Sequence, residues 1–400
     1  MSIDPATLAA SILGASAVRT APRSHPHHEL PLVAPASREE CVELVRAAAS
    51  ARIGIHVLGG GSALRGAPTS GHALILCTER LDRVLAHERD DLTFTAEAGL
   101  RVLRAQAGLR PHGQRLALAP RAEGSTLGGT VARAADGWTR KSTGFVRDQV
   151  LGIEVVTGAG KRITGGGRVV KNVSGFDLCR LFTGARASLG ILLSLTFRLR
   201  SVPETRRVTR HAAADLAHAF SAARSIDQRI PDAEVLRVTR HEDGRASLLL
   251  SLAGARARVD AAIRSADDAL PRGEVLAPEA LEGTHHCVLR VDVQPAHTER
   301  ASHVLAGLTR ALRIDADIAT GTIEAFSVEV QPFTEDERAL LARGLSGLEA
   351  LVDFPGDARA HLRREAAFGA TPAEHYPVLQ RLWRHFDPAG ILEPGVHPWK

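Results

Sequence analysis

The stretch that decides the fold reads IGIHVLGGGSALRGAPTSG and covers residues 53–71. An apolar run from Ile53 to Leu58 predicts a short buried strand, which ends at the glycines Gly59–Gly61. Consecutive glycines permit backbone conformations that other residues avoid, and they let a ligand approach the main chain. Such a turn directs several backbone N–H groups toward one point and forms an anion-binding concavity. Ser62 and Arg65 would add hydroxyl and guanidinium contacts to a phosphate, and a glycine-rich turn without a ligand is the alternative interpretation.

Two common phosphate-binding loops do not match this stretch. A Walker loop requires Gly-Lys-Ser/Thr after its glycines, and that sequence is missing here. A Rossmann fingerprint requires Gly-x-Gly-x-x-Gly at the start of a helix, which is missing as well. The sequence therefore predicts a phosphate cradle of some other fold.

Composition and charge narrow the class of protein. The 400 residues are 44% hydrophobic, which is enough for two domains with apolar cores. The net charge is +5, and acidic residues alternate with arginines, so we expect a solvated surface and no nucleic-acid partner. The four cysteines, Cys41, Cys77, Cys179 and Cys287, form no Cys-x-x-Cys pair and predict neither a disulfide framework nor an iron–sulfur site. The chain shows no secretory leader and no apolar run of transmembrane length, so we expect a soluble, cytoplasmic protein.

A second glycine-rich region begins with LALAPRAEGSTLGG at residues 116–129. Its glycines Gly124, Gly128 and Gly129 flank Ser125 and Thr126, and a helix of small residues is expected from about Thr130. Backbone N–H groups and hydroxyls at such a place suit a pyrophosphate or the edge of a flavin ring. Further glycine clusters follow the predicted strand at residues 150–156 and precede the one at 195–199. Repeated clusters at strand ends favour a ligand-binding role over simple turns.

On these motifs the chain resembles the flavin-binding fold of the vanillyl-alcohol oxidase and p-cresol methylhydroxylase (PCMH) superfamily over residues 24–203. The segment GFVRDQVLGIEVVTGAGKRITGGGRVVKNVSGFDLCRLFTGARASLGIL, residues 144–192, is similar to the FAD-binding E subunit of bacterial glycolate oxidase. It departs at Ser174 and Phe176, where that family usually has alanine and tyrosine. The close GILEPG resembles the family's GILNPG, with Glu393 in place of asparagine.

The resemblance implies FAD as the cofactor. In the family the GGGS turn cradles the pyrophosphate, regions like 120–129 and 144–148 hold the ribityl and isoalloxazine parts, and a turn like 189–191 lies near the adenine. The motifs and the resemblance together give the FAD-binding residues Gly59, Gly60, Gly61, Ser62, Ala63, Leu64, Arg65, Gly66, Pro120, Gly124, Ser125, Thr126, Gly128, Gly129, Gly144, Val146, Gly190 and Ile191.

The resemblance also bears on the chemistry. Ser62 stands where covalently flavinylated relatives often have histidine, so we expect non-covalent FAD. Arg147 or Lys171 is the candidate cation beside the N1–C2 edge of the flavin, and no catalytic base is identified. We expect no metal site, because adjacent residues such as His285 and His286 point to opposite faces of a strand.

The expected fold class is α+β: a PCMH-type two-subdomain FAD-binding fold followed by an α+β cap domain with an antiparallel sheet and helices on one face. The expected parts are an N-terminal helix and leader (1–23), the FAD-binding domain (24–203), the cap (204–375) and a C-terminal segment returning to the FAD domain (376–400). The leader's His25, His27 and His28 are expected in an exposed linker.

Local patterns also place several helices. Ser37 is the expected N-cap of a helix that opens with the acidic residues Glu39 and Glu40, where the helix dipole favours them. The apolar stripe of this helix would consist of Cys41, Leu44, Val45 and Ala48. In the cap, helices are expected at residues 212–225, 255–269 and 298–311.

These features give three hypotheses. In the first, the chain is an FAD-dependent oxidoreductase, the FAD-binding subunit of a glycolate-oxidase-like complex that oxidises a 2-hydroxy acid. Its partners would be a catalytic flavoprotein subunit and an iron–sulfur subunit, in the cytoplasm or held at the inner membrane through them. The alternatives are a stand-alone FAD-dependent oxidase or dehydrogenase of a small hydroxy acid or alcohol, and a non-catalytic flavoprotein scaffold subunit.

Overall fold

The computed structural model describes residues 3–21, 27–61, 71–119, 122–167, 176–271, 273–277, 286–327, 331, 333–354 and 376–393. The fold is α+β, as expected, and the chain divides into two compact units. Unit 1 comprises Met1–Gly137, Phe145–Val202 and Ala373–Lys400, and unit 2 comprises Trp138–Gly144 and Pro203–Pro372. The segment Trp138–Gly144 therefore belongs to unit 2 although both of its flanks belong to unit 1.

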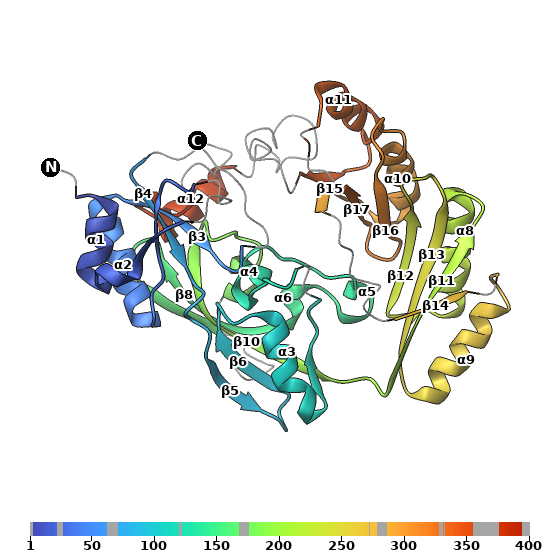
Figure 1. The fold of residues 1–400 in the computed structure, drawn as a ribbon, viewed down its shortest axis with the longest axis horizontal. Helices are drawn as coiled ribbons and strands as arrows, with labels where there is room; N and C mark the ends of the chain where they lie inside the picture. The colour runs from blue at the N-terminus through green and yellow to red at the C-terminus, as the bar shows by residue number, and fades with distance from the viewer. Residues whose placement is uncertain are drawn as a thin grey trace. The chain divides into compact units, whose positions relative to one another are not determined.

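Unit 1 begins with a four-stranded sheet in the order β1-β2-β4-β3, in which β2, β4 and β3 are parallel and β1 is antiparallel (Figure 1). Its strands are β1 (Val18–Thr20), β2 (Pro31–Val33), β3 (Gly54–Leu58) and β4 (Ala73–Cys77). Its helices are α1 (Pro5–Leu13) and α2 (Arg38–Ala51). Helix α2 begins as predicted, because the Ser37 side chain accepts a hydrogen bond from Glu40 N at 3.1 Å and acidic residues occupy the first turn.

The second sheet of unit 1 is antiparallel and has the order β5-β6-β10-β8-β9, with β7 also paired to β10. Its strands are β5 (Val84–Glu88), β6 (Thr93–Glu97), β7 (Gln114–Leu116), β8 (Val150–Thr157), β9 (Arg162–Gly166) and β10 (Gly190–Ser201). The helices of this part are α3 (Val102–Leu109), α4 (Leu127–Ala132), α6 (Val146–Gln149) and α7 (Leu178–Phe182).

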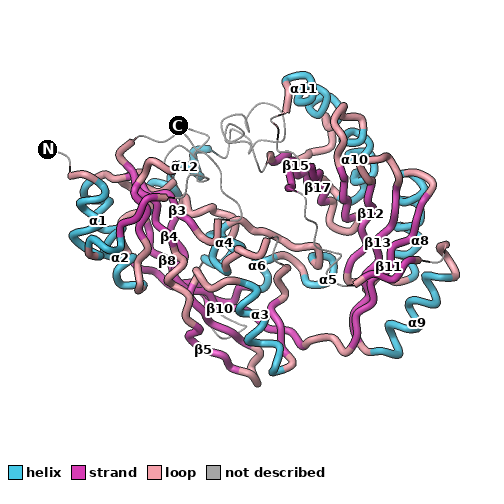
Figure 2. Tube along the Cα trace, in the orientation of Figure 1, coloured by secondary structure: helices cyan, strands magenta, loops and turns pink. Residues whose placement is uncertain are grey.

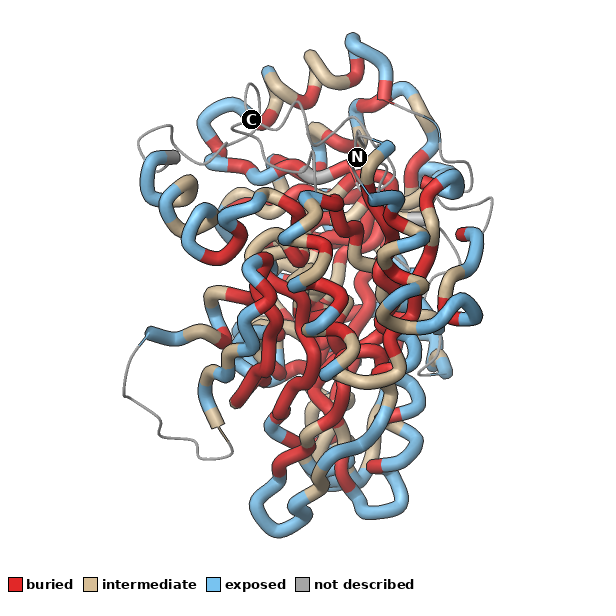
Figure 3. The backbone as a smooth tube through the Cα atoms, turned by 90° about the vertical axis from the view of Figure 1, so that its left-hand side faces the viewer, coloured by how far each residue is buried: buried red, intermediate tan, exposed pale blue. Residues whose placement is uncertain are grey.

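Helix α2 joins the two sheets of unit 1 through one apolar cluster. Its predicted stripe of Cys41, Leu44, Val45 and Ala48 is completely buried. The same cluster contains Leu76 of the first sheet and Leu193 of the second. Figure 3 shows the buried segments of the backbone in red. Because burial of such side chains stabilises a fold by about 1.5–3 kcal/mol each, α2 holds the two sheets of unit 1 together.

Unit 2 is built on an eight-stranded antiparallel sheet in the order β14-β11-β13-β12-β16-β17-β15-β18. Its strands are β11 (Thr205–Ala213), β12 (Val235–Arg240), β13 (Ala246–Gly254), β14 (Glu274–Leu276), β15 (His286–Asp292), β16 (Arg313–Asp317), β17 (Thr322–Ser327) and β18 (Leu351–Asp353). Its helices are α5 (Arg140–Thr143), α8 (Leu216–Arg229), α9 (Arg256–Asp267), α10 (Thr298–Ala306) and α11 (Glu335–Gly344).

The two faces of this sheet differ. One face carries alternate apolar residues such as Leu248 and Leu250, which share a core cluster with helices α8 to α11. Figure 2 shows α8 and α10 beside the strands of this unit. Helices α8 to α11 gather on one face, as the sequence predicted, whereas Arg140 of α5 contacts Thr322 on the opposite face.

The C-terminal part returns to unit 1, where α12 (Tyr376–Phe386) packs Phe386 against the core of the second sheet. The chain then pairs with the edge of the first sheet, because Ile55 N donates to Ile391 O at 2.7 Å and Glu393 N donates to Ile55 O at 2.9 Å. Among the described residues, no helix has the length and apolar character needed to cross a membrane.

Three local expectations were wrong. The helix expected from Ala212 begins at Leu216, because Ala212 continues β11 and pairs with Ser247. The helix expected from about Thr130 begins at Leu127, after an N-cap at Thr126. The leader is not wholly exposed, because His27 is buried and its ring stacks on the His56 ring at 4.6 Å; His25 lies outside the described residues.

Candidate functional site

The first glycine turn follows strand β3 directly. Thr78 N donates to the carbonyl oxygen of Leu58, the last residue of β3, at 2.9 Å and fixes the end of that strand. Gly60 touches the second glycine region, since a Cβ placed on Gly60 would lie 1.4 Å from Gly124 O. Gly61 has φ +73°, a conformation that favours glycine. The predicted residues Ser62, Ala63, Leu64, Arg65 and Gly66 lie outside the described residues.

The second glycine turn leads into helix α4. The Thr126 hydroxyl oxygen accepts a hydrogen bond from Gly129 N at 3.1 Å, and Ser125 O accepts one from Val102 N at 2.9 Å. Gly128 N donates to Ala98 O at 2.7 Å, and a Cβ on Gly128 would lie 2.7 Å from the Ala98 side chain. This turn is therefore anchored on the backbone that follows β6. Pro120 lies outside the described residues.

We call the residues Gly59–Gly61 and Gly124–Gly129 the glycine cradle. Its two halves meet twice, at Gly60 with Gly124 and at Gly59, whose Cβ position lies 2.7 Å from Thr126 Oγ1. The contact requires both turns to lack side chains, so ordinary turn formation does not explain the pattern. A surface of backbone peptide groups and small hydroxyls is suited to a pyrophosphate. The residues present thus fit the phosphate-bearing part of a dinucleotide.

The remaining predicted residues lie apart from these contacts. Val146 is buried, and its N–H donates to Asp136 Oδ1 at 2.7 Å, whereas Gly144 belongs to unit 2. Arg147 is about half exposed, with its guanidinium 4.4 Å from the centre of the Phe145 ring. The role of Arg147 beside a flavin stays a prediction, and Lys171 lies outside the described residues.

Gly190 and Ile191 begin strand β10, where they pair with Thr157 and Val156. A Cβ on Gly190 would lie 2.5 Å from Val155 Cγ1, so the close packing of β10 on β8 is sufficient to require glycine. Ile191 is completely buried in the cluster that contains helix α2. Binding roles for these two residues stay predictions.

The C-terminal segment contributes one residue, Glu393, that the sequence analysis did not assign to the site. Glu393 accepts a hydrogen bond from Val57 N at 2.8 Å, and its other oxygen lies 3.2 Å from His56 Nδ1. These contacts brace β3 immediately before the glycine cradle. In the sequence, Glu393 stands out only as a departure from the family that the chain resembles. Its partners Val57 and His56 lie 336 and 337 residues away, and no local pattern reveals contacts over that separation.

Unit 2 carries a different arrangement, a charged face on its sheet. We call Arg237, Arg290, Arg313, Asp292, Asp315, Asp317 and Glu324 the charged sheet face. Arg313 Nη2 donates to Asp315 Oδ2 at 2.7 Å, Arg290 Nε donates to Asp292 Oδ2 at 2.8 Å, and Arg140 of α5 donates to Thr322 at 3.0 Å. Alternation along each strand, as in Arg313-Ile-Asp-Ala-Asp317, is the signal that would have revealed this face.

The pKa values of two aspartates of this face are shifted in opposite directions. Burial acts to raise the pKa of Asp292, but the Arg290 charge and hydrogen bonds outweigh it, so the pKa lies below its ordinary value. Burial raises the pKa of Asp317 despite hydrogen bonds from the backbone of residues 319 and 320. Ionisable groups tuned in this way are common at functional sites and in structural ion-pair networks alike. Within the described ranges, no three His, Cys, Asp or Glu side chains gather to hold a metal ion.

Comparison with known proteins agrees with the geometry of unit 1. The FAD binding domain family matches residues 30–166. Glycolate oxidase subunit GlcE of Escherichia coli is 35% identical over 165 residues, which are 40% of this chain and 47% of that protein. Glycolate oxidase subunit GlcD of Bacillus subtilis is 31% identical over 179 residues, 44% of this chain and 38% of that protein. The matched region thus spans less than half the length of either relative.

Structural similarity extends further than sequence similarity. A solved structure of alkyldihydroxyacetonephosphate synthase superposes with a TM-score of 0.68 at 18% identity, covering 90% of this chain and 75% of that protein. At this identity the likeness shows the fold alone. The family match falls on the region that contains both halves of the glycine cradle, and FAD is the cofactor of that domain. Residues 30–166 therefore match an FAD-binding domain, and the relatives support a relation of this part of the chain to the FAD-binding PCMH-type superfamily.

Proposed function

We propose that this chain is the FAD-binding subunit of a glycolate-oxidase-like complex that oxidises a 2-hydroxy acid and passes electrons to partner centres. The observation that carries the proposal is the contact of Gly60 with Gly124, which forms a cradle of backbone groups within the domain matched to FAD binding. Similarity to glycolate oxidase subunits supports the choice of substrate class.

In this proposal the cradle holds the FAD pyrophosphate without a covalent bond. Backbone N–H groups of Gly59–Gly61 and of the turn at Gly124 would face the phosphates, together with the Ser125 and Thr126 hydroxyls. Bound FAD supplies the hydride acceptor for oxidation of the substrate. Arg147 is the described candidate for a cation at the flavin edge, because its guanidinium is half exposed next to the buried Val146.

Partners complete the proposed electron path. Cys41, Cys77 and Cys179 are buried singly, and burial raises the pKa of the Cys41 thiol to about 12. Such thiols are structural and do not ligate a cluster. We therefore assign the iron–sulfur relay to another subunit and the primary substrate site to a catalytic flavoprotein subunit, in the cytoplasm or at the inner membrane surface through those partners.

A stand-alone dehydrogenase is the second candidate, and the charged sheet face of unit 2 favours it. A small hydroxy acid carries a carboxylate, which arginines bind through paired hydrogen bonds. Arg237 and Arg313 lie on that face, although Asp315 contacts both in this structure. Under this hypothesis the isolated chain has its own substrate site, and the scaffold hypothesis predicts a flavin that no substrate reduces.

The test is anaerobic addition of glycolate or D-lactate to the purified, FAD-loaded chain, with absorbance followed at the flavin bands. The complex-subunit proposal predicts that the bands persist until catalytic and iron–sulfur subunits are added. Bleaching by the hydroxy acid alone would select the stand-alone enzyme. Bands that persist even with all subunits present would leave only the scaffold role.

A further inference from the structure

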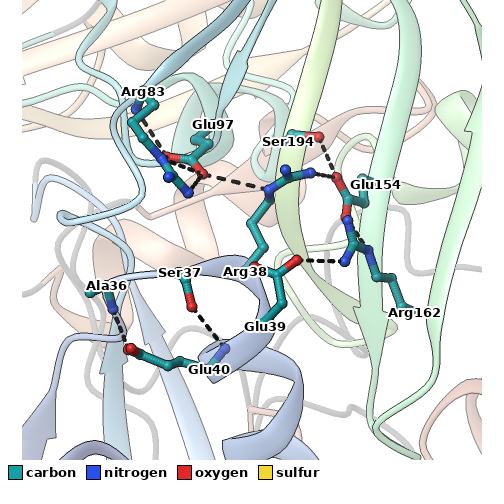
Figure 4. Close-up of polar contacts among 10 residues, drawn as sticks. All are labelled: Ala36, Ser37, Arg38, Glu39, Glu40, Arg83, Glu97, Glu154, Arg162 and Ser194. Atoms are coloured by element: carbon teal, nitrogen blue, oxygen red, sulfur yellow. Dashed lines mark hydrogen bonds and ion pairs between the residues drawn. The ribbon is translucent and has the colours of Figure 1, made fainter.

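A buried ionic network lies between helix α2 and the second sheet of unit 1 (Figure 4). Its centre is Arg38, the first residue of α2. Arg38 Nε lies 3.5 Å from Glu97 Oε1 on β6, and Arg38 Nη1 contacts Glu154 Oε2 on β8. We call Arg38, Glu97 and Glu154 the Arg38 bridge. One guanidinium from the first turn of a helix thus contacts carboxylates on two different strands.

The bridge crosses three neighbouring strands. Strand β10 lies between β6 and β8, and its Ser194 is the direct cross-strand partner of both Glu97 and Glu154. The Ser194 hydroxyl also donates to Glu154 Oε2 at 2.8 Å. Directly opposite residues lie on the same face of a sheet, so the three side chains form a row beneath Arg38. This geometry restrains both the translation and the rotation of α2 over the sheet.

The carboxylates of the bridge are buried, and each also has a cation of its own. The Glu97 side chain is 0% exposed, that of Glu154 is 8% exposed and that of Arg38 is 21% exposed. Arg83 Nη2 donates to Glu97 Oε1 at 2.8 Å and Arg162 contacts Glu154, so the distinct role of Arg38 is that it contacts both carboxylates. Buried ion pairs of this kind are best attested as devices that select one relative placement of elements. The placement selected here is that of the first sheet against the second.

Both halves of the glycine cradle are connected to residues 98–100, the backbone segment directly after Glu97. On one side, Ala98 O accepts from Gly128 N at 2.7 Å and Leu100 O accepts from Leu127 N at 2.9 Å, which anchors the second turn. On the other side, a Cβ on Gly99 would lie 1.8 Å from Thr78 O.

Thr78 in turn holds the end of β3 through the 2.9 Å bond from its N–H to Leu58 O, one residue before Gly59. Any shift of Glu97 is therefore passed to both turns through backbone contacts.

We propose that Arg38 is a positioning residue for FAD: by holding Glu97 and Glu154 together it sets the separation of the two halves of the glycine cradle. The inference rests on the proposed role of the cradle in binding FAD. It assigns a cofactor-related role to a helix residue that does not itself belong to the cradle. A bridge that only stabilised the fold would leave the affinity of the folded protein for FAD unchanged.

The test compares Arg38→Met with Arg162→Met. Arg162 belongs to the same network, since its guanidinium contacts Glu154 and donates to Glu39 Oε1 at 2.9 Å, but its contacts do not include Glu97. Each variant loses one cation. Apo-protein is titrated with FAD below its unfolding temperature, and the circular dichroism of the bound flavin is recorded. We expect Arg38→Met to weaken FAD binding about tenfold or more, which corresponds to about 1.4 kcal/mol, and to change the flavin dichroism, whereas Arg162→Met retains both.

Equal affinity and dichroism in the wild type and a folded Arg38→Met protein would overturn the proposal. If Arg38→Met does not fold, Arg38→Lys takes its place, because an ammonium keeps the charge but lacks the planar fork that reaches two carboxylates. Weaker FAD binding by folded Arg38→Lys supports the proposal, and unchanged binding refutes it.

A failure of the proposed function has a different signature. If the wild type itself does not bind FAD, the cradle assignment fails, and amide hydrogen exchange still tests the bridge. Faster exchange at residues 59–61 and 124–129 in Arg38→Met than in Arg162→Met would show that the bridge positions the turns. Equal exchange in the two variants would refute that role.

Discussion

The glycine cradle of unit 1 and the charged sheet face of unit 2 are two opposite ways of building a polar surface. In the cradle the absence of side chains lets Gly60 contact Gly124, and the surface consists of backbone groups. On the sheet face the side chains matter, and Arg290 and Arg313 pair with aspartates two residues along their own strands. A backbone surface is rigid and suits a cofactor that stays bound, whereas charged side chains can exchange partners. The cradle of unit 1 is therefore suited to holding a ligand, and the charged sheet face of unit 2 is suited to electrostatic contacts.

We expect the largest loss of FAD affinity when a side chain is added to the glycine cradle. Gly60→Ala places a Cβ 1.4 Å from Gly124 O, so one turn must move. A displacement of about 1 Å can cost about 100-fold in function, and we expect at least that loss in FAD affinity, measured by fluorescence titration. Gly108→Ala is the matched control, because nothing lies within 4 Å of a Cβ there. FAD binding by Gly60→Ala at the wild-type level would show that the two turns do not form the cradle.

A smaller effect is expected from the C-terminal brace of β3. Glu393→Ala leaves His56 Nδ1 and Val57 N without their carboxylate partner. An unsatisfied buried group costs about 1–3 kcal/mol, so the free energy of unfolding in urea should fall by that amount. Glu393→Gln keeps an acceptor for Val57 N and should lose less. Equal losses in the two variants would mean that the backbone bond contributes nothing.

Two aspartates of the charged sheet face are expected to make the free energy of unfolding depend on pH in opposite directions. The pKa of Asp292 is lowered in the folded state, so its ionised form adds stability above the unfolded pKa of about 4 and this stability is lost as pH falls. The pKa of Asp317 is raised, so its stabilising contribution is present below that pH and is lost as pH rises through the folded pKa.

Urea unfolding of Asp292→Asn and Asp317→Asn from acid to neutral pH measures both slopes. Removal of Asp292 should reduce the gain of stability with rising pH, and removal of Asp317 should reduce the loss. Parallel shifts with unchanged slopes in both variants would show that neither aspartate is perturbed.

The smallest effect concerns thiols. Cys41, Cys77 and Cys179 of unit 1 are buried, and burial raises the pKa of Cys41 to about 12 and those of the other two to about 11. Cys287 of unit 2 is partly exposed. Mass spectrometry after brief iodoacetamide treatment of the native protein should find label first on Cys287. Preferential labelling of the three unit 1 cysteines would contradict the closed core described for that unit.

Local patterns were enough to predict much of unit 1. The strand ending at Leu58, the N-cap at Ser37 and the α+β class are confirmed by the structure. These features depend on neighbours in sequence, which propensity and periodicity capture. The start of α8 was missed because strand pairing with β13 draws Ala212 and Ala213 into β11, a tertiary effect on residues of high helix propensity.

Long-range contacts explain what the sequence could not reveal. Glu97 and Glu154 look like solvent-facing positions of strands, and their partner Arg38 looks like an ordinary residue of a helix start. Only the packing of α2 across β6, β10 and β8 turns them into a buried row. The charged sheet face was missed for a related reason, since helices α9 and α10 separate β12, β15 and the β16–β17 pair along the chain.

The central claim is that the glycine cradle binds FAD without a covalent bond. The most direct measurement is the visible spectrum of the purified chain after FAD loading and gel filtration, followed by acid precipitation. We expect flavin bands that co-elute with the protein and remain in the supernatant after acid treatment. A chain that elutes colourless after incubation with FAD would contradict the claim, and flavin retained in the acid pellet would contradict its non-covalent part.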